Sequence, residues 1–117
     1  MEMYDNAHFG RPTDVPGICE FLEIKKDALR IFLNSTLELK KALMEENQER
    51  AEAMIEEREA CIRKINVVDV RLKRHSQQNP GFFARLSPEG KLRFSHLAKG
   101  IEDILDQMNA INKECIA

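Results

Sequence analysis

The residues between Gly17 and Pro80 contain neither glycine nor proline. Because these two residue types most often interrupt helices, the stretch favours long helices over the many turns of a sandwich or a barrel. One helix over the whole stretch would be roughly 90 Å long at about 1.5 Å per residue. A compact domain of this size has a radius of gyration of roughly 13 Å. The chain therefore either folds back within this stretch or forms a rod.

The polar run from residue 45 to residue 50 is the best place for the chain to reverse, and Asn47 at its centre is a favoured helix-capping residue. Before this run, apolar residues recur at steps of three and four in two neighbouring rows. The pattern predicts a helix over 18–46 that contacts more than one partner helix. The main row comprises Ile18, Leu22, Leu29, Phe32, Leu39 and Leu43, and the second row comprises Phe21, Ile24, Ala28 and Ile31.

Beyond Asn47 the charges change sign along the chain, from glutamates early on to lysines and arginines near His75. This order complements the dipole of a second helix over 48–75. Two alternatives stay open: the β-branched run 67–70 is a short strand, or 18–75 is one long helix that dimerises. The apolar row of the second helix comprises Met54, Cys61, Ile65, Val68 and Leu72, with Arg58 in its open slot and Ile55 and Ile62 on its flank.

A third helix is predicted over 88–115. Ser87, Pro88 and Glu89 supply a cap, a proline at the first helical position and an acid in the first turn. Gly100 costs this helix about 1 kcal/mol relative to alanine, and it either permits a close helix approach or is simply tolerated. Apolar residues form a coiled-coil-like seam at Phe94, Leu97, Ile101, Ile104, Met108, Ile111 and Cys115.

The three predicted helices would each be roughly 42 Å long. Equal lengths and short connections favour antiparallel neighbours. We therefore expect an all-α fold, an antiparallel up-down-up three-helix bundle forming a single domain over 15–117, with the apolar segment 82–86 folded onto one end. Residues 1–14 show no periodicity and are expected to be a flexible arm, with Asp14 or Val15 capping the first helix ahead of Pro16.

Composition narrows the class of protein. With 18 basic and 20 acidic residues the net charge is -2, which argues against a nucleic-acid partner. No apolar run reaches the ~18 residues of a membrane span, and the first residues lack the pattern of a signal peptide. An odd set of cysteines without a CxxC pair, namely Cys19, Cys61 and Cys115, indicates free, buried thiols in the cytoplasm.

Residue patterns for catalysis are absent from the sequence. The histidines His8, His75 and His96 do not pair with cysteine or carboxylate residues at metal-ligand spacing. No glycine-rich phosphate loop, GxSxG or HExxH motif occurs. We therefore expect no catalytic residue, no metal and no cofactor.

One short segment, from His96 to Gly100, reads H-x-x-K-G. It resembles the acceptor segment of histidine phosphotransfer domains. The resemblance implies that His96 takes a phosphoryl group, that Lys99 one turn away reduces charge repulsion, and that Gly100 leaves room for the partner's active site. Those domains need a four-helix bundle, and only one helix is predicted from residue 88 onward. A histidine phosphotransfer protein is thus the alternative function.

Residues 49–65 are similar to the second helix of small flagellar export chaperones of the FliT and FlgN type. In that family an acidic turn precedes a stretch of the form L-x-x-L-x-x-x-R-x-x-L-I-x-x-I. Here Arg58 takes the arginine position, Ile62 belongs to the next apolar pair and Ile65 holds the last slot. The resemblance implies a small, non-catalytic cytoplasmic protein that holds a filament-cap or hook-junction subunit before its export.

In such a chaperone an apolar helix face docks an amphipathic segment of the client. The seam of helix 88–115 is the best candidate for this face, and the flexible Met108 suits an adaptable surface. The same residues are core positions if every apolar row is internal, and they are a dimer seam if the protein is a homodimeric scaffold. The predicted partner-binding residues are Leu97, Ile101, Ile104, Met108 and Ile111.

Overall fold

The computed structural model describes residues 17–116, with backbone only for 113–116. The expected arm 1–14 and the expected capping residues Asp14, Val15 and Pro16 lie outside this range. All regular secondary structure of the described chain is helical, with α2 at Gly17–Met44, α3 at Gln48–Gln78, α4 at Phe82–Arg85 and α5 at Pro88–Ile116. The all-α prediction is confirmed, and the run 67–70 is helical rather than a strand.

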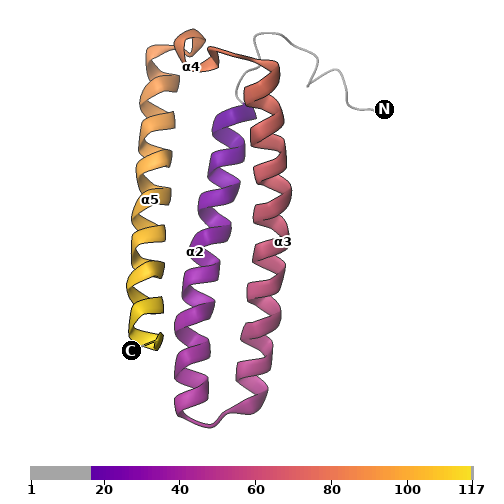
Figure 1. Ribbon diagram of the computed structural model, residues 1–117, viewed down its shortest axis with the longest axis vertical. Helices are drawn as coiled ribbons and strands as arrows, with labels where there is room; N and C mark the ends of the chain where they lie inside the picture. Colours follow the sequence, from indigo (N-terminus) through magenta and orange to yellow (C-terminus); the bar gives the residue numbers. More distant parts are fainter. Residues whose placement is uncertain (1–16, 117) are drawn as a thin grey trace, which may run out of the picture.

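The three long helices lie side by side along the molecule, with α2 between α5 and α3 (Figure 1). Successive long helices alternate in direction, so that α2 is antiparallel to α3 and parallel to α5. Both flanking helices pack on α2, whereas α3 and α5 make little direct contact with each other. The molecule measures 53 × 31 × 21 Å, so it is elongated but far shorter than the rod a single helix would give.

A tight turn at residues 45–47 reverses the chain between α2 and α3. The Asn47 backbone N–H donates to Ala42 O at 2.8 Å, and the Asn47 side chain accepts from Arg50 N at 3.1 Å. Glu46 adopts a left-handed backbone with φ 55°, which turns the chain out of the first helix. The prediction of a break at Asn47 is confirmed, and the alternative of one long helix over 18–75 is wrong.

Small side chains let α2 and α3 approach closely. Ala28, Ser35 and Ala42 recur every seven residues on α2, and their side chains are 2%, 1% and 2% exposed. The Ser35 hydroxyl donates a hydrogen bond to the Glu57 carboxylate of α3. Ion pairs join Lys25 to Asp69 at 2.8 Å and Arg50 to Glu38 at 3.2 Å across the same contact.

A different row of α2 packs against α5. The central core cluster consists of Leu29, Leu33, Ile101 and Ile104, and a second cluster toward the α4 end consists of Ile18, Cys19 and Leu97. An ion pair between Arg93 and Glu23, at 2.8 Å, closes the edge of this contact. The prediction that α2 contacts two partner helices agrees with this packing. The rows differ from those read in the sequence, since Ser35 and Ala42 belong to neither of them and Ile24 and Ile31 of the second row are 38% and 44% exposed.

The chain crosses from α3 to α5 over the end of the molecule. Gly81 has φ 75°, a conformation that favours glycine, and the four-residue helix α4 follows it. Phe82 and Leu86 pack against the second core cluster, which confirms that this segment folds onto the end. At the start of α5, Gly90 N donates to the capping Ser87 hydroxyl at 3.0 Å. The helix α4 was not among the expected helices, so the described chain has four helices rather than three.

Candidate partner-binding surface

The apolar seam of α5, which was predicted from the sequence to bind a partner, lies inside the molecule. Leu97, Ile101 and Ile104 are 8%, 7% and 4% exposed, and Met108 and Ile111 pack, partly buried, against the central cluster. Leu29 and Leu33 of α2 cover this seam. The expectation of an open binding face at these five residues is thus corrected, because they form the internal contact between α5 and α2.

The residues that carry the chaperone resemblance have three different environments. The Arg58 guanidinium stacks on the Phe32 ring of α2, 4.7 Å from its centroid, and its Nε is buried without a hydrogen-bond partner among the described residues. Ile65 is partly buried against the central cluster. Ile62 is 44% exposed. Arg58 therefore helps to join α2 to α3, and only Ile62 is open to a partner.

In the H-x-x-K-G segment, two side chains are exposed and the glycine lies against α2. His96 and Lys99 are exposed, and Lys99 pairs with Glu102 and Asp103 at 3.3 Å each. Its hydrogen bonds to Glu102 and then to Asp103 raise the pKa of Lys99. A Cβ at position 100 would lie 2.7 Å from Lys26 Cε, so the side chain of Lys26 fills the space beside Gly100. That space is therefore taken by α2 and is not left open above His96.

Replacing Gly100 with alanine should raise the free energy of unfolding by about 0.5–1 kcal/mol. The atoms that a new Cβ meets belong to the flexible end of Lys26, which can rotate away, whereas the helix gains alanine's higher propensity. Urea denaturation measures the difference, with Gly81→Ala as a destabilising control because position 81 has a positive φ. A loss of stability on Gly100→Ala would show that Lys26 is fixed in its place.

Two cysteines are described, and both are free and buried. Burial raises the pKa of the Cys19 and Cys61 thiols, so neither thiol is activated as a nucleophile. This agrees with the prediction of buried thiols, and the side chain of Cys115 lies outside the described part. Among the side chains of residues 17–112, which the structure describes, no three His, Cys, Asp or Glu gather as a metal site would require. None of the described helices combines the length and apolar character of a membrane span.

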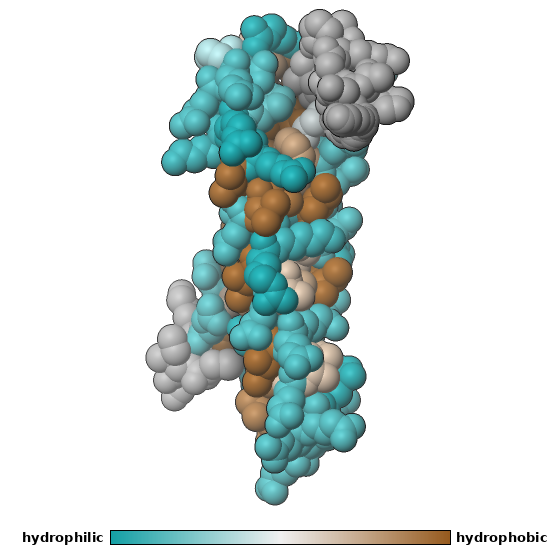
Figure 2. Space-filling view, turned by 90° about the vertical axis from the view of Figure 1, so that its right-hand side faces the viewer, coloured by the Kyte–Doolittle hydropathy of each residue, from teal (hydrophilic) through white to brown (hydrophobic). Residues whose placement is uncertain are grey.

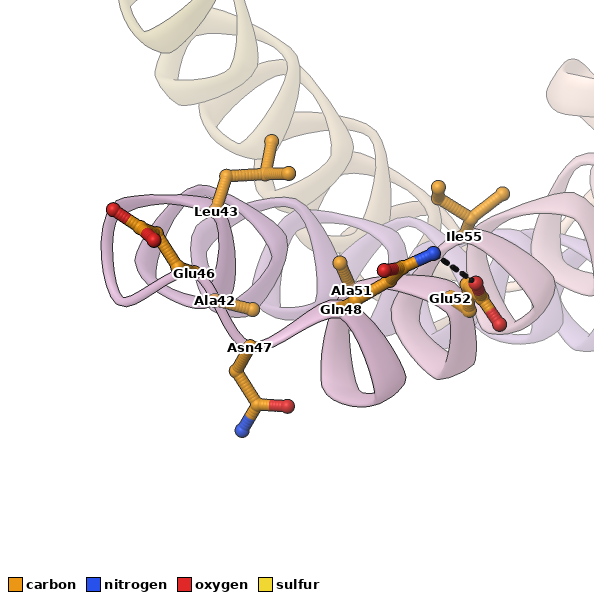
Figure 3. A pocket seen from close by; sticks show the side chains of 8 residues that line it. All are labelled: Ala42, Leu43, Glu46, Asn47, Gln48, Ala51, Glu52 and Ile55. Carbon is orange, nitrogen blue, oxygen red and sulfur yellow. Dashed lines mark hydrogen bonds between the residues drawn. The ribbon is translucent and has the colours of Figure 1, made fainter.

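Uncovered apolar side chains gather instead at the hairpin end of α2 and α3. A pocket of about 490 Å³ lies there, and Leu43 and Ile55, which border it, are 62% and 42% exposed. Figure 3 shows both side chains projecting to the same side of the hairpin, whereas Asn47 points away. The pocket is lined by Ala42, Leu43, Glu46, Asn47, Gln48, Ala51, Glu52 and Ile55.

The floor and rim of this hairpin-end pocket differ in character. Ala42 and Ala51 are buried and form an apolar floor between the helices. Glu46 and Glu52 supply carboxylates at the rim, and Gln48 Nε2 donates to Glu52 Oε2 at 3.1 Å. Within the described chain neither glutamate forms an ion pair. An apolar floor with uncompensated negative charge at its rim suits an amphipathic, basic segment.

The sequence reading placed Leu43 in a core row and Ile55 beside one. Leu43 ends its row next to the polar turn, so no helix turn of α5 covers it. Ile55 and Ile62 are seven residues apart, which places them on one face and outside the row that packs on α2. The sequence predicted no partner helix for Ile55 and Ile62. These two apolar residues on one face of α3 were therefore the sequence signal that could have identified this surface.

Comparisons of the chain with models of protein families, with curated proteins and with solved structures found no match.

Proposed function

We propose that the protein is a non-catalytic binding module that holds an amphipathic helical segment of a partner protein at the hairpin-end pocket. The exposure of Leu43 and Ile55 around this pocket is the observation that carries the proposal. Contiguous apolar surface on a small protein marks interaction sites. Burying one leucine side chain contributes roughly 1.5–3 kcal/mol to the free energy of binding. Burial of Leu43 and Ile55 would therefore stabilise the complex with the partner.

The charges at the rim specify the kind of segment. Glu46 and Glu52 would face the polar edge of a docked helix, which favours lysine or arginine beside its apolar face. In helix-in-groove recognition the apolar anchors of the bound helix are three or four residues apart. The proposed ligand is therefore a basic amphipathic helix.

We propose further that the partner is a flagellar filament-cap or hook-junction protein and that this protein is its cytoplasmic export chaperone. The resemblance of residues 49–65 to that chaperone family supports this narrower function. The packing of α3 and α5 on α2 supports an up-down-up three-helix bundle as its scaffold. The free, buried Cys19 and Cys61 support a reducing compartment.

Substituting Leu43 by aspartate should weaken binding of this partner at least about tenfold. The change removes an apolar anchor and adds a third negative charge beside Glu46 and Glu52. Isothermal titration with purified filament-cap and hook-junction proteins of the source organism measures the effect. Circular dichroism should show unchanged helicity, because Leu43 is 62% exposed.

Leu92→Asp is the matched control, since Leu92 is 61% exposed but lies on α5 away from the pocket. It should leave the affinity unchanged. Equal losses for the two variants would show that the hairpin-end pocket is not the binding site. If neither flagellar protein binds the unsubstituted chain, the flagellar function is wrong.

A further inference from the structure

A lateral face of α3, beside the row that packs on α2, carries a continuous stripe of exposed side chains. Its members follow one another at steps of three or four residues, so they share one face of the helix. The apolar members Ile55, Ile62 and Val70 are 42%, 44% and 56% exposed. Figure 2, which views the molecule from the α3 side, shows hydrophobic side chains spaced along its length between hydrophilic ones. The α3 stripe comprises Gln48, Glu52, Ile55, Glu59, Ile62, Asn66, Val70, Lys73 and Gln77, all exposed.

The order of residues along this stripe is close to symmetric about Ile62. Moving outward from Ile62, the stripe meets Glu59 and Asn66, then Ile55 and Val70, then Glu52 and Lys73, and finally two glutamines. The two members of each pair differ by only one residue in their separation from Ile62, so the centre of symmetry lies between Ile62 and Arg63. An antiparallel copy would thus bring an apolar residue to an apolar residue and an acid to a base.

We propose that the α3 stripe binds the same stripe of a second copy of this chain, forming an antiparallel homodimer with its two-fold axis beside Ile62, between residues 62 and 63. Ile62 would then meet Ile62 of the second copy, and each Ile55 would meet a Val70. Glu52 and Lys73 form two equivalent ion pairs toward the ends of the contact. The Asn66 amide donates to the Glu59 carboxylate nearer the axis.

A second copy fits this face better than an unrelated helix, because acidic and basic residues lie at matching distances from the centre. Within the described chain neither Glu52 nor Lys73 is engaged in an ion pair, and the Glu52 carboxylate accepts a hydrogen bond only from Gln48, so both charges are available. The stripe is roughly 45 Å long at about 1.5 Å per residue, but only three apolar side chains per copy lie on it. With so few apolar side chains we expect a contact below about 1,200 Å², the size that is characteristic of transient complexes. The proportion of dimer should therefore depend on the protein concentration.

This dimer does not depend on the proposed partner function. It does share three residues with the hairpin-end pocket, since Gln48, Glu52 and Ile55 line that pocket and also belong to the stripe. Dimerisation therefore covers one of the two anchors of that pocket.

Sedimentation equilibrium over a wide range of protein concentration tests the proposal by charge reversal. Glu52→Lys and Lys73→Glu should each raise the dimer dissociation constant about tenfold, since each turns two attractive pairs into repulsive ones. The double variant restores opposite charges and should return to within about threefold of the unsubstituted protein. Glu56→Lys and Arg71→Glu make the same charge changes on exposed positions of α3 outside the stripe, and they should leave the dissociation constant unchanged.

Cysteine cross-linking tests the position of the axis. In a Cys115→Ser background, Ile62→Cys should form a disulfide-linked dimer on mild oxidation, because residue 62 meets itself across the axis. Val67→Cys, at a position that is 53% exposed but lies outside the stripe, should remain monomeric. A chain that stays monomeric at millimolar concentration would overturn the proposal. So would a double charge reversal that fails to restore association, or cross-linking that is equally efficient at position 67.

Discussion

Replacing Ile104 with alanine should lower the free energy of unfolding by about 2–4 kcal/mol. Ile104 is 4% exposed and belongs to the central core cluster with Leu29, Leu33 and Ile101. Truncation removes apolar surface from this contact between α2 and α5 and leaves a cavity that the elongated core cannot readily close. Because a small domain has a total stability of only about 5–15 kcal/mol, this is a large fraction of what holds α5 in place.

Urea denaturation followed by circular dichroism measures the loss, and Ile104→Asp should unfold the protein outright. Leu105→Ala is the adjacent control, because Leu105 is 41% exposed and should cost well under 1 kcal/mol. If Ile104→Ala were harmless to stability but abolished partner binding, the seam of α5 would be a binding face after all.

Replacing Ser35 with leucine should destabilise the hairpin of α2 and α3 by about 2–3 kcal/mol. Ser35 is 1% exposed and lies in the line of small residues with Ala28 and Ala42. A leucine there has no space between the two helices, so it forces them apart. The separation also disturbs the ion pair between Lys25 and Asp69, which crosses the same contact.

Ser35→Ala separates the effect of volume from that of the hydrogen bond. It removes only the bond from the Ser35 hydroxyl to Glu57, and since the carboxylate can then be hydrated, it should cost about 1 kcal/mol. Thermal and urea unfolding of both variants give the comparison. Similar losses for leucine and alanine would mean that the hydrogen bond, not the close approach, holds the two helices together.

The long helices could be predicted from sequence because their boundaries carry local signals. Asn47 caps α3 as its position in the polar run indicated, and Ser87 caps α5 ahead of Pro88. The width of the apolar pattern of α2 correctly implied two partner helices, although Ile24 and Ile31 of its second row are exposed. The helix α4 could not be predicted in this way, because four residues are too short to show a period.

The candidate site was harder to predict, because periodicity identifies residues that share a face but not what covers that face. The regular seam with Ile104 is covered by α2 and became core. Leu43, at the end of a similar row, is left open by the turn that follows it. Whether Gly100 permits a close approach could not be read from the sequence, and only the structure shows that the side chain of Lys26 lies beside it.

The location of partner binding is tested most directly by methyl chemical-shift mapping of this protein while a purified flagellar filament-cap or hook-junction protein is added. The methyl signals of Leu43 and Ile55, beside the hairpin-end pocket, should shift, and those of the buried Ile101 and Ile104 should stay in place. Shifts centred on Ile101 and Ile104, or no shift with either protein, would contradict the proposed function.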